Sequence, residues 1–299
     1  MLSVKNLVKE FNGLTAVNNI SFQVDEGKIF GLLGPNGAGK TTTIRTILNI
    51  IKPTQGEILF DNKKISNDFF NIIGYLPEER GLYKKSKVID VIRYFGELKN
   101  MSADSVQKEA KQWLEKLEMT DYVNKKVEEL SKGNQQKIQF ITSVIHNPKL
   151  LILDEPFSGL DPINQQMIKE KILDFVTSGK IIILCTHQME TAEKLCSEIF
   201  LMNSGKEVLS GSISKIKKQF GGNNVKLEYD GDASFISNLP FVIHADIYNN
   251  YAEVQLKDSF KPSEFLKAVV EKVSVSQFSV IEPTLNKIFI DSISKSAGN

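Results

Sequence analysis

A glycine-rich stretch at residues 30–43, Phe-Gly-Leu-Leu-Gly-Pro-Asn-Gly-Ala-Gly-Lys-Thr-Thr-Thr, contains the pattern G-x-x-x-x-G-K-[ST]. Glycines in this pattern leave backbone N–H groups free to surround the phosphates of a nucleotide. We expect the Lys40 ammonium to reach the β- and γ-phosphates and the Thr41 hydroxyl to ligate Mg²⁺. A plain glycine-rich turn is the alternative, but the apolar strand predicted before the stretch and the helix predicted after it favour a phosphate site.

Two adjacent acids form the second candidate group. They end the apolar run at residues 150–156, Leu-Leu-Ile-Leu-Asp-Glu-Pro, which is typical of a buried central parallel strand. We expect Asp154 to hold Mg²⁺ and Glu155 to act as a base toward water, with a solvated strand end as the bland alternative. His187 closes another apolar run, and although a lone histidine is usually structural, this one is predicted at the same edge of the sheet as Asp154.

Two further motifs adjoin predicted turns or helix ends. Residues 130–138 read Leu-Ser-Lys-Gly-Asn-Gln-Gln-Lys-Ile and open an apolar-periodic helix, so Ser131 and the amides after it mark a helix N-terminus available to an anion. Phe11 precedes an Asn-Gly turn. Its ring either packs as a core or turn aromatic or lies against a flat base.

The elements that must position these residues follow from hydrophobic periodicity. Residues 2–24 predict two antiparallel strands that lead into the strand before the glycine-rich stretch, and residues 42–51 predict the helix after it. Residues 57–60 and 72–76 predict two more strands. Residues 87–130 change to a helical period and predict a helical insertion, in which Tyr94, Phe95 and Trp113 are expected in the core.

The tail beyond residue 210 carries no chemical motif. Residues 212–220 predict a basic helix. Strands at 225–229, 242–248, 252–257 and 275–281, with helices at 233–239 and 262–273, give the order β-α-β-β-α-β, which is the ferredoxin-like order. A last helix is expected from 282–289. An accessory domain that stabilises or regulates a dimer is the favoured role for this segment, with a small-ligand sensor as the alternative.

Composition sets limits on the class of protein. The chain has 299 residues, 41% of them hydrophobic and 24% charged, as expected for a globular protein of up to two domains. With 37 basic and 36 acidic side chains, a surface that coats nucleic acid is not expected. The two cysteines and the absence of a secretory leader pattern predict a cytosolic protein, and apolar runs too short to span a membrane place any membrane contact in a partner.

Taken together, the motifs at 34–42, 130–135, 150–156, 158–161 and 187 resemble, in order and spacing, the nucleotide-binding domain of ABC transporters. The resemblance covers residues 1–215. It implies an α/β P-loop NTPase fold of the ABC type, with a mixed sheet core, an antiparallel β subdomain and a helical subdomain at about 78–149. Residues 216–299 then form a small α+β C-terminal accessory domain.

The resemblance also implies roles for individual residues. Phe11 is expected to stack on adenine, Glu155 to polarise the attacking water, and His187 to contact the γ-phosphate. The residues expected to hold ATP are Phe11, Gly34, Pro35, Asn36, Gly37, Ala38, Gly39, Lys40, Thr41, Thr42, Ser131, Gly133 and Asp161. Those expected to catalyse are Glu155, His187 and Lys40, and those expected on Mg²⁺ are Thr41, Asp154 and Glu78.

Two positions depart from the family pattern. Lys132 replaces the first glycine and Asn134 the glutamine of Leu-Ser-Gly-Gly-Gln, while Ser131 and Gly133 remain. Glu78 stands where the family has a glutamine; a carboxylate can ligate Mg²⁺, but its charge leaves open whether it contacts the metal or only couples to a membrane partner. Both variants resemble the subgroup that pairs with ABC-2-type membrane subunits, such as sodium-export and drug- or antibiotic-resistance ATPases.

The resulting hypothesis is an ATPase subunit that dimerises over two Mg-ATP, with Ser131 and Gly133 reaching the nucleotide of the other copy. The partners are a second ATPase subunit, identical or a close paralogue, and a separate ABC-2-type permease through which export is driven, which places the protein on the cytoplasmic face of the membrane. A soluble ABC ATPase acting on ribosomes or nucleic acid is the alternative. A degenerate module that binds but does not hydrolyse ATP is a third hypothesis, disfavoured by intact Lys40, Asp154, Glu155 and His187.

Overall fold

The computed structural model describes residues 1–66, 68–79, 81–221, 223–257 and 259–297, with side chains described as far as residue 292. It divides into two compact units, Met1–Gly211 and Ser212–Asn299. The sequence-based boundary at residue 215 falls inside the first helix of the second unit.

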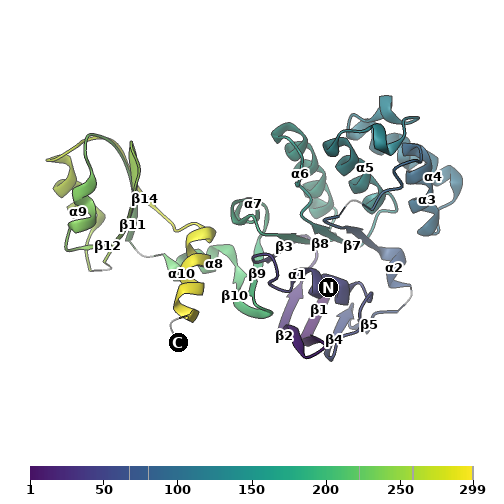
Figure 1. Cartoon of the computed structure of the whole chain (residues 1–299), viewed down its shortest axis with the longest axis horizontal. Coiled ribbons are helices and arrows are strands. Elements are labelled where there is room, and N and C mark those ends of the chain that lie inside the picture. Colours follow the sequence, from purple (N-terminus) through teal and green to yellow (C-terminus); the bar gives the residue numbers. More distant parts are fainter. Residues whose placement is uncertain (67, 80, 222, 258, 298–299) are drawn as a thin grey trace. The chain divides into compact units, whose positions relative to one another are not determined.

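A six-stranded sheet forms the centre of the first unit (Figure 1). Its order is β10 (Lys206–Ser212), β9 (Glu198–Asn203), β3 (Lys28–Leu33), β8 (Ile181–Thr186), β7 (Leu150–Asp154) and β6 (Ile73–Leu76). The five strands from β9 to β6 pair in parallel. Strands β7 and β8 are completely buried, which explains their continuous aliphatic runs. Because the two strands are parallel, their carboxyl ends lie at the same edge of the sheet.

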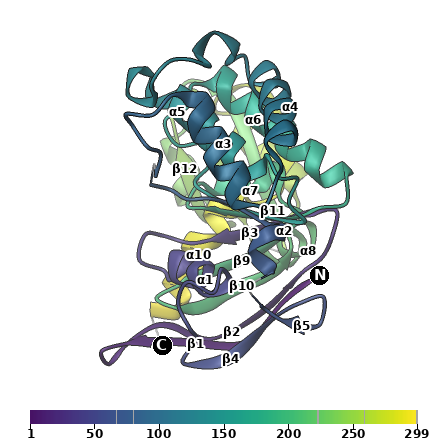
Figure 2. The ribbon, with the colours of Figure 1, turned by 90° about the vertical axis from the view of Figure 1, so that its right-hand side faces the viewer.

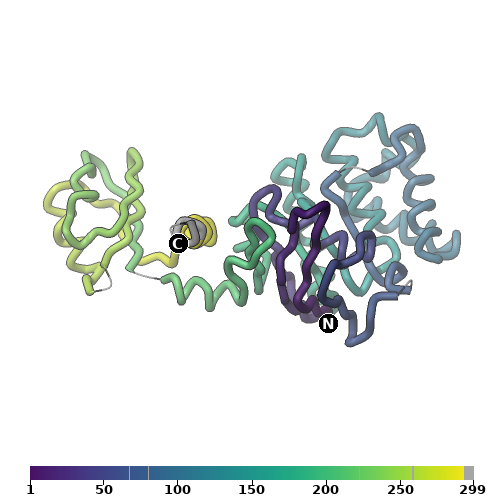
Figure 3. The backbone as a smooth tube through the Cα atoms, turned by 60° about the horizontal axis from the view of Figure 1, so that its bottom comes forward, coloured from purple at the N-terminus to yellow at the C-terminus, as the bar shows by residue number. Residues whose placement is uncertain are grey.

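A second, antiparallel sheet runs in the order β2 (Leu14–Val24), β1 (Leu2–Phe11), β4 (Gln55–Phe60) and β5 (Lys63–Lys64). Asn12 and Gly13 connect β1 to β2 with φ angles of 47° and 86°, as a tight hairpin turn requires. Figure 3 shows this hairpin in purple. The predicted pair of antiparallel strands and its Asn-Gly turn are confirmed.

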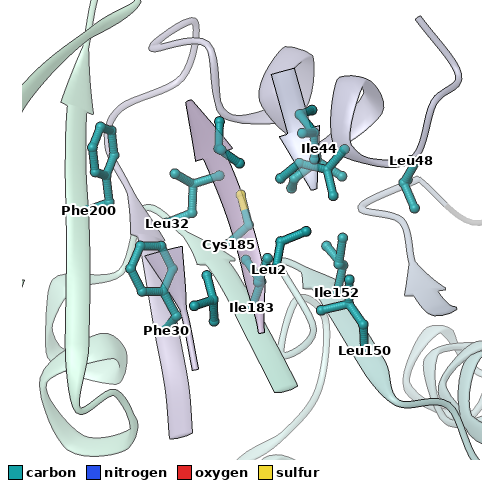
Figure 4. Close-up of a cluster of buried hydrophobic side chains, with 14 of the residues drawn as sticks. Leu2, Phe30, Leu32, Ile44, Leu48, Leu150, Ile152, Ile183, Cys185 and Phe200 are labelled. Atoms are coloured by element: carbon teal, nitrogen blue, oxygen red, sulfur yellow. The ribbon is translucent and has the colours of Figure 1, made fainter. Parts of the chain in front are cut away.

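Side chains from both sheets and from α1 (Lys40–Ile47) share one hydrophobic core. Figure 4 shows Leu2 of β1, Leu32 of β3, Ile44 of α1, Ile152 of β7 and Ile183 of β8 converging in it. Removing this apolar surface from water stabilises the unit and holds the ends of β3, β7 and β8 at fixed positions.

Helices make up the rest of the first unit. They are α2 (Phe69–Ile72), α3 (Val88–Leu98), α4 (Ala103–Lys116), α5 (Lys132–Val144), α6 (Pro162–Thr177) and α7 (Met189–Leu195), with short 3₁₀ turns at Thr120–Tyr122 and Val127–Glu129. In Figure 2, α3, α4 and α5 gather at one end of the unit, as predicted for the helical insertion. Trp113 is buried and stacks on Phe175, whereas Tyr94 is 44% exposed against Tyr83. The core prediction is therefore wrong for Tyr94, because its position on α3 faces outward.

The second unit has a four-stranded antiparallel sheet in the order β12 (Val242–Ile247), β13 (Tyr251–Leu256), β11 (Asn223–Asp230) and β14 (Ser274–Ile281). In chain order this is the ferredoxin-like arrangement, with a 3₁₀ helix at Ser234–Asn238 in place of the first helix and α9 (Pro262–Val270) as the second. A separate core lies around Phe265. Helices α8 (Ile213–Phe220) and α10 (Leu285–Ala297) complete the unit.

In the described part of the chain, no helix is both long and apolar enough to cross a membrane.

A half-buried histidine, His146, lies just after the end of α5. His146 Nε2 lies 2.9 Å from the carbonyl oxygen of Ile73, whereas Nδ1 is buried without a hydrogen-bond partner. Burial, followed by the charge of Lys99, lowers the pKa of His146 to about 4. In the unfolded chain this histidine has a pKa near 6.5. As the pH falls, the unfolded chain therefore takes up a proton at a higher pH than the folded protein does.

We expect the free energy of unfolding to decrease as the pH falls from about 6.5 toward 4, with His146 accounting for roughly 1–2 kcal/mol of the loss at pH 5. Urea denaturation of the wild type and of His146→Gln at pH 7 and pH 5 measures this contribution, since the carboxylates are common to both. An equal loss of stability in the two proteins would contradict the assignment.

Candidate nucleotide-binding and catalytic site

The glycine-rich loop connects β3 to α1, as predicted, and its backbone requires glycine at specific points. Gly34, Gly37 and Gly39 have φ angles of 150°, 79° and 103°. A Cβ on Gly34 would lie 2.2 Å from the carbonyl oxygen of Met202, and one on Gly39 would lie 2.6 Å from that of Ala16. Gly37 has no such neighbour. Two of the glycines therefore allow close packing against other strands, while the third provides only a turn.

Lys40 begins α1 directly after this loop and is buried. Its Nζ donates hydrogen bonds to the carbonyl oxygens of Gly34 at 2.8 Å and Pro35 at 3.0 Å. The ammonium group is thus held against the backbone of the loop that precedes it. Ala38 is buried on the inner side of the loop, and its carbonyl oxygen accepts a hydrogen bond from Gly205 N.

A cavity of about 670 Å³ opens beside the loop. Its lining combines residues from the loop, from the ends of β6 and β7, from the start of β2 and from one turn that the sequence analysis did not select. The lining residues are Leu14, Thr15, Ala16, Asn36, Gly37, Gly39, Lys40, Thr41, Thr42, Glu78, Asp154, Glu155, Ser204 and Gly205. The lysine, the threonine hydroxyls and the three carboxylates predicted to serve one site therefore do share one cavity.

Asp154 ends β7 and is 2% exposed. Burial is the main cause that raises the pKa of its carboxyl; a hydrogen bond with the Cys185 thiol acts in the opposite direction, and the nearby charges of Glu78 and Glu155 raise it further. Carboxylate and hydroxyl oxygens are the ligands that Mg²⁺ prefers, so the donor set of Asp154, Thr41 and Glu78 fits this ion. Among the described residues no group of three or more His, Cys, Asp or Glu is placed to hold a metal.

Glu155 follows in the left-handed region with a φ of 48°, an unusual conformation for a residue other than glycine. Its Oε1 accepts hydrogen bonds from the backbone N–H of His187 at 2.8 Å and lies 2.6 Å from His187 Nδ1. Its Oε2 accepts a hydrogen bond from Thr186 Oγ1 at 3.0 Å. The carboxylate and the imidazole are thus paired at the edge where β7 and β8 end, an arrangement able to take up and pass on a proton.

Eight of the predicted site residues do not line this cavity. Gly34, Pro35 and Ala38 belong to the adjoining loop and His187 contacts Glu155, whereas Phe11, Ser131, Gly133 and Asp161 belong to neither group. Phe11 is 43% exposed, and its ring faces Lys9 Nζ at 4.7 Å from the ring centre. Ser131 caps α5 by accepting a hydrogen bond from Asn134 N, and Asp161 caps α6 in the same way from Asn164 N. The structure places Gly133 beside the turn that precedes Asp161, because a Cβ on it would lie 3.6 Å from the carbonyl oxygen of Gly159. Phe11, Ser131, Gly133 and Asp161, all among the described residues, are thus absent from the lining of the cavity in their own chain.

Sequence reasoning missed one turn that lines the cavity. Ser204 and Gly205 have φ angles of 48° and 77° and connect β9 to β10. Gly205 N donates to Ala38 O, and Gly205 O accepts from Asn18 N at 2.8 Å, so this turn ties the glycine-rich loop to β2. The Asn-Ser-Gly sequence predicts a turn, but nothing in it indicates which loop the turn contacts.

A glycine-rich loop between a parallel strand and a helix, with a buried aspartate at the end of a neighbouring strand, defines the fold and site as those of a P-loop nucleoside triphosphatase. The family model described as "ABC transporter" matches residues 17–158. A second model, "ATP-binding protein DrrA1-3-like, C-terminal domain", matches residues 211–293.

Relatives of known sequence are similar over nearly the whole chain. The ABC transporter ATP-binding protein YhaQ of Bacillus subtilis is 42% identical over 293 residues, which cover 98% of each chain. The linearmycin resistance ATP-binding protein LnrL of the same organism is 28% identical over 97% of each chain. A solved ATP-binding subunit of an ABC transporter superposes with a TM-score of 0.69 at 27% identity, covering 74% of this chain and 93% of that one.

The chain therefore belongs to the ATP-binding proteins of ABC transporters, and its activity is the hydrolysis of ATP. ATP-binding subunits of this family work as dimers together with a transmembrane permease. The predicted fold class and family are confirmed.

Replacing a glycine of the loop by alanine should cost more stability where the glycine lies against another strand than where it only adopts a left-handed backbone. Gly34→Ala should lower the free energy of unfolding by more than about 3 kcal/mol, because strain in φ adds to the clash with Met202 O. Gly37→Ala should cost only about 1–2 kcal/mol, for the left-handed backbone alone. Urea unfolding without nucleotide measures the free energy of unfolding of both variants. Equal losses in the two would show that the backbone around Gly34 and Met202 O can move apart to accept a Cβ.

Proposed function

We propose that Glu155 is the base that activates water in ATP hydrolysis and that His187 assists it at the γ-phosphate. The observation that carries this proposal is the position of Glu155: the residue is 7% exposed, it lines the same cavity as Lys40 and Asp154, and its carboxylate is oriented by His187. A buried, oriented carboxylate next to the phosphate loop is suited to accept a proton from water.

The remaining residues of the loop hold the nucleotide in this proposal. Lys40 moves from its carbonyl partners to the β- and γ-phosphates, and the N–H groups of residues 34–42 surround the triphosphate. Thr41 and Asp154 hold Mg²⁺, with Glu78 as a further ligand or as a charge that senses the ion. When bound, the ion supplies positive charge that offsets the phosphates and the carboxylates.

The site is completed by a second copy. Ser131 and Gly133 lie away from the cavity of their own chain, so a contact between these residues and a γ-phosphate needs another subunit. Asp161, at the start of α6, then lies in the same interface. Phe11 is exposed and free of core packing, which leaves its ring available to stack on adenine.

We further propose that the dimer drives export through an integral membrane subunit of the ABC-2 type, which keeps the protein on the inner face of the cell membrane. Similarity to a linearmycin resistance ATP-binding protein over 97% of the chain supports this direction of transport, as does 33% identity to a Nod factor export ATP-binding protein of Cupriavidus pinatubonensis over 71% of the chain. These relatives favour the transporter hypothesis over the soluble one.

An apolar groove of about 500 Å³ supports a membrane partner. It is lined by Leu48, Ile50, Phe70, Ile73, Tyr75, Pro77, Gly81, Leu82, Phe95, Leu98, Lys99, Gln139, Thr142, Ser143 and His146. Ile50, Phe70 and Leu98 are exposed in it, as expected for a surface that another protein covers. We assign it to a short apolar helix or loop on the inner side of the permease.

The loop around Glu78 links this groove to the nucleotide cavity. Gln139 Nε2 donates hydrogen bonds to the carbonyl oxygens of Pro77 at 3.1 Å and Glu79 at 3.0 Å, on both sides of Glu78. Pro77 lines the groove, whereas Glu78 lines the cavity. A segment that fills the groove therefore acts on the same short loop as the nucleotide.

Replacing the proposed base tests the catalytic assignment. Glu155→Gln should lower the steady-state ATPase rate by about 10²–10⁴-fold, because an amide cannot accept the proton. The variant should still bind ATP and accumulate as an ATP-bound dimer, which size-exclusion chromatography with light scattering detects. Turnover close to that of the wild type would rule out Glu155 as the base.

Charges placed in the groove test the membrane partner. In cells that produce the permease, Phe70→Glu with Leu98→Glu should reduce the membrane-bound fraction of the protein at least about tenfold, since an unpaired charge is costly to bury. Leu173→Glu is the matched control, because Leu173 is also an exposed leucine on a helix but lies outside the groove. Equal membrane binding by both variants would contradict the assignment, and ATPase activity in solution shows that they are folded.

A further inference from the structure

Thr186 is the last residue of β8 and is 1% exposed. None of the roles given above uses it. It stands between Cys185, whose thiol contacts Asp154, and His187, whose imidazole contacts Glu155. Its backbone position is fixed because the whole of β8 is buried between β3 and β7.

The direction of its hydroxyl proton is determined by two hydrogen bonds. Thr186 Oγ1 accepts a hydrogen bond from the backbone N–H of Gln188 at 3.1 Å. It lies 3.0 Å from Glu155 Oε2, and a carboxylate oxygen can only accept. The single hydroxyl proton is therefore donated to Glu155, and the N–H of Gln188 keeps the hydroxyl from turning away.

The two oxygens of Glu155 thus have different surroundings. Oε2 is held by a buried hydroxyl on a rigid strand end. Oε1 is held by the N–H and the imidazole of His187, whose side chain is 52% exposed and has room to move. If the imidazole turned toward a phosphate, Oε1 would lose its side-chain partner and could meet water, while Oε2 would keep its bond to Thr186.

We propose that Thr186 is a positioning residue for ATP hydrolysis: it fixes Oε2 of Glu155 so that Oε1 is presented to the attacking water. This inference rests on the proposed function of Glu155 as the base. Glu155 has a left-handed backbone, with a φ of 48°. Hydrogen bonds hold this backbone from Glu155 N to Cys185 O at 2.9 Å and from Ser158 N to Glu155 O at 3.1 Å, whereas the carboxylate is oriented by Thr186 and His187.

The test compares Thr186→Val, which keeps the shape but lacks the hydroxyl, with Thr186→Ser, which keeps the hydroxyl. Thr186→Val should lower the kcat for ATP about 10- to 100-fold, because a hydrogen bond to a charged group is lost, and should leave the KM for ATP nearly unchanged. Thr186→Ser should recover most of the rate. Thr46→Val serves as the control, since Thr46 is a buried threonine whose hydroxyl donates only within α1, to Thr42 O at 2.8 Å.

A double variant separates positioning from a general loss of structure. In a Glu155→Gln background, adding Thr186→Val should produce little further loss of rate, because the residue through which Thr186 acts is already disabled. If Glu155→Gln is inactive while Thr186→Val keeps the wild-type kcat, or if the two losses multiply, the positioning role is overturned and the base assignment stands. If Glu155→Gln itself keeps normal turnover, the base assignment fails and this inference fails with it.

Discussion

Two carboxylates buried at the end of an apolar sheet are the constraint on which the first unit depends. Asp154 ends strand β7, whose other side chains are all aliphatic, and Glu155 follows it; both residues are nearly inaccessible to water. A buried charge is costly unless partners compensate for it. The partners here come from different parts of the chain: the charge of Lys40 and the Cys185 thiol act on Asp154, and Thr186 and His187 bond to Glu155. The loops after β3, β7 and β8 are thereby drawn to one place.

Much of this architecture could be predicted because short-range patterns in the sequence determine it. Continuous aliphatic runs predicted β7 and β8, and the Asn-Gly turn predicted the β1–β2 hairpin. Element boundaries were less certain. Helix α1 begins at Lys40 rather than at residue 42, because the left-handed Gly39 already ends the loop. The helical period alone predicts Tyr94 in the core, but it does not give the width of the buried face of the helix, and Tyr94 lies outside that face.

The site was predictable where one motif supplies both the residue and its position, as at Lys40, Thr41 and Asp154. It was not predictable where contacts join segments far apart in the sequence. The Ser204–Gly205 turn reaches the loop at Ala38 through a backbone hydrogen bond, which leaves no mark in residue types. Thr186 carries no signal in the sequence because a threonine at the end of a strand is ordinary, and only the geometry shows its hydroxyl directed at Glu155.

We propose that each working site combines the loop at residues 34–42 of one copy with Ser131 of another. Mixing two inactive variants tests it directly. Lys40→Ala disables one half of the site and Ser131→Arg the other, so a mixed dimer has one site with both halves intact. We predict that each variant alone hydrolyses ATP negligibly and that an equal mixture recovers about a quarter of the wild-type rate. If the mixture remains as inactive as the separate variants, the site is not shared between subunits.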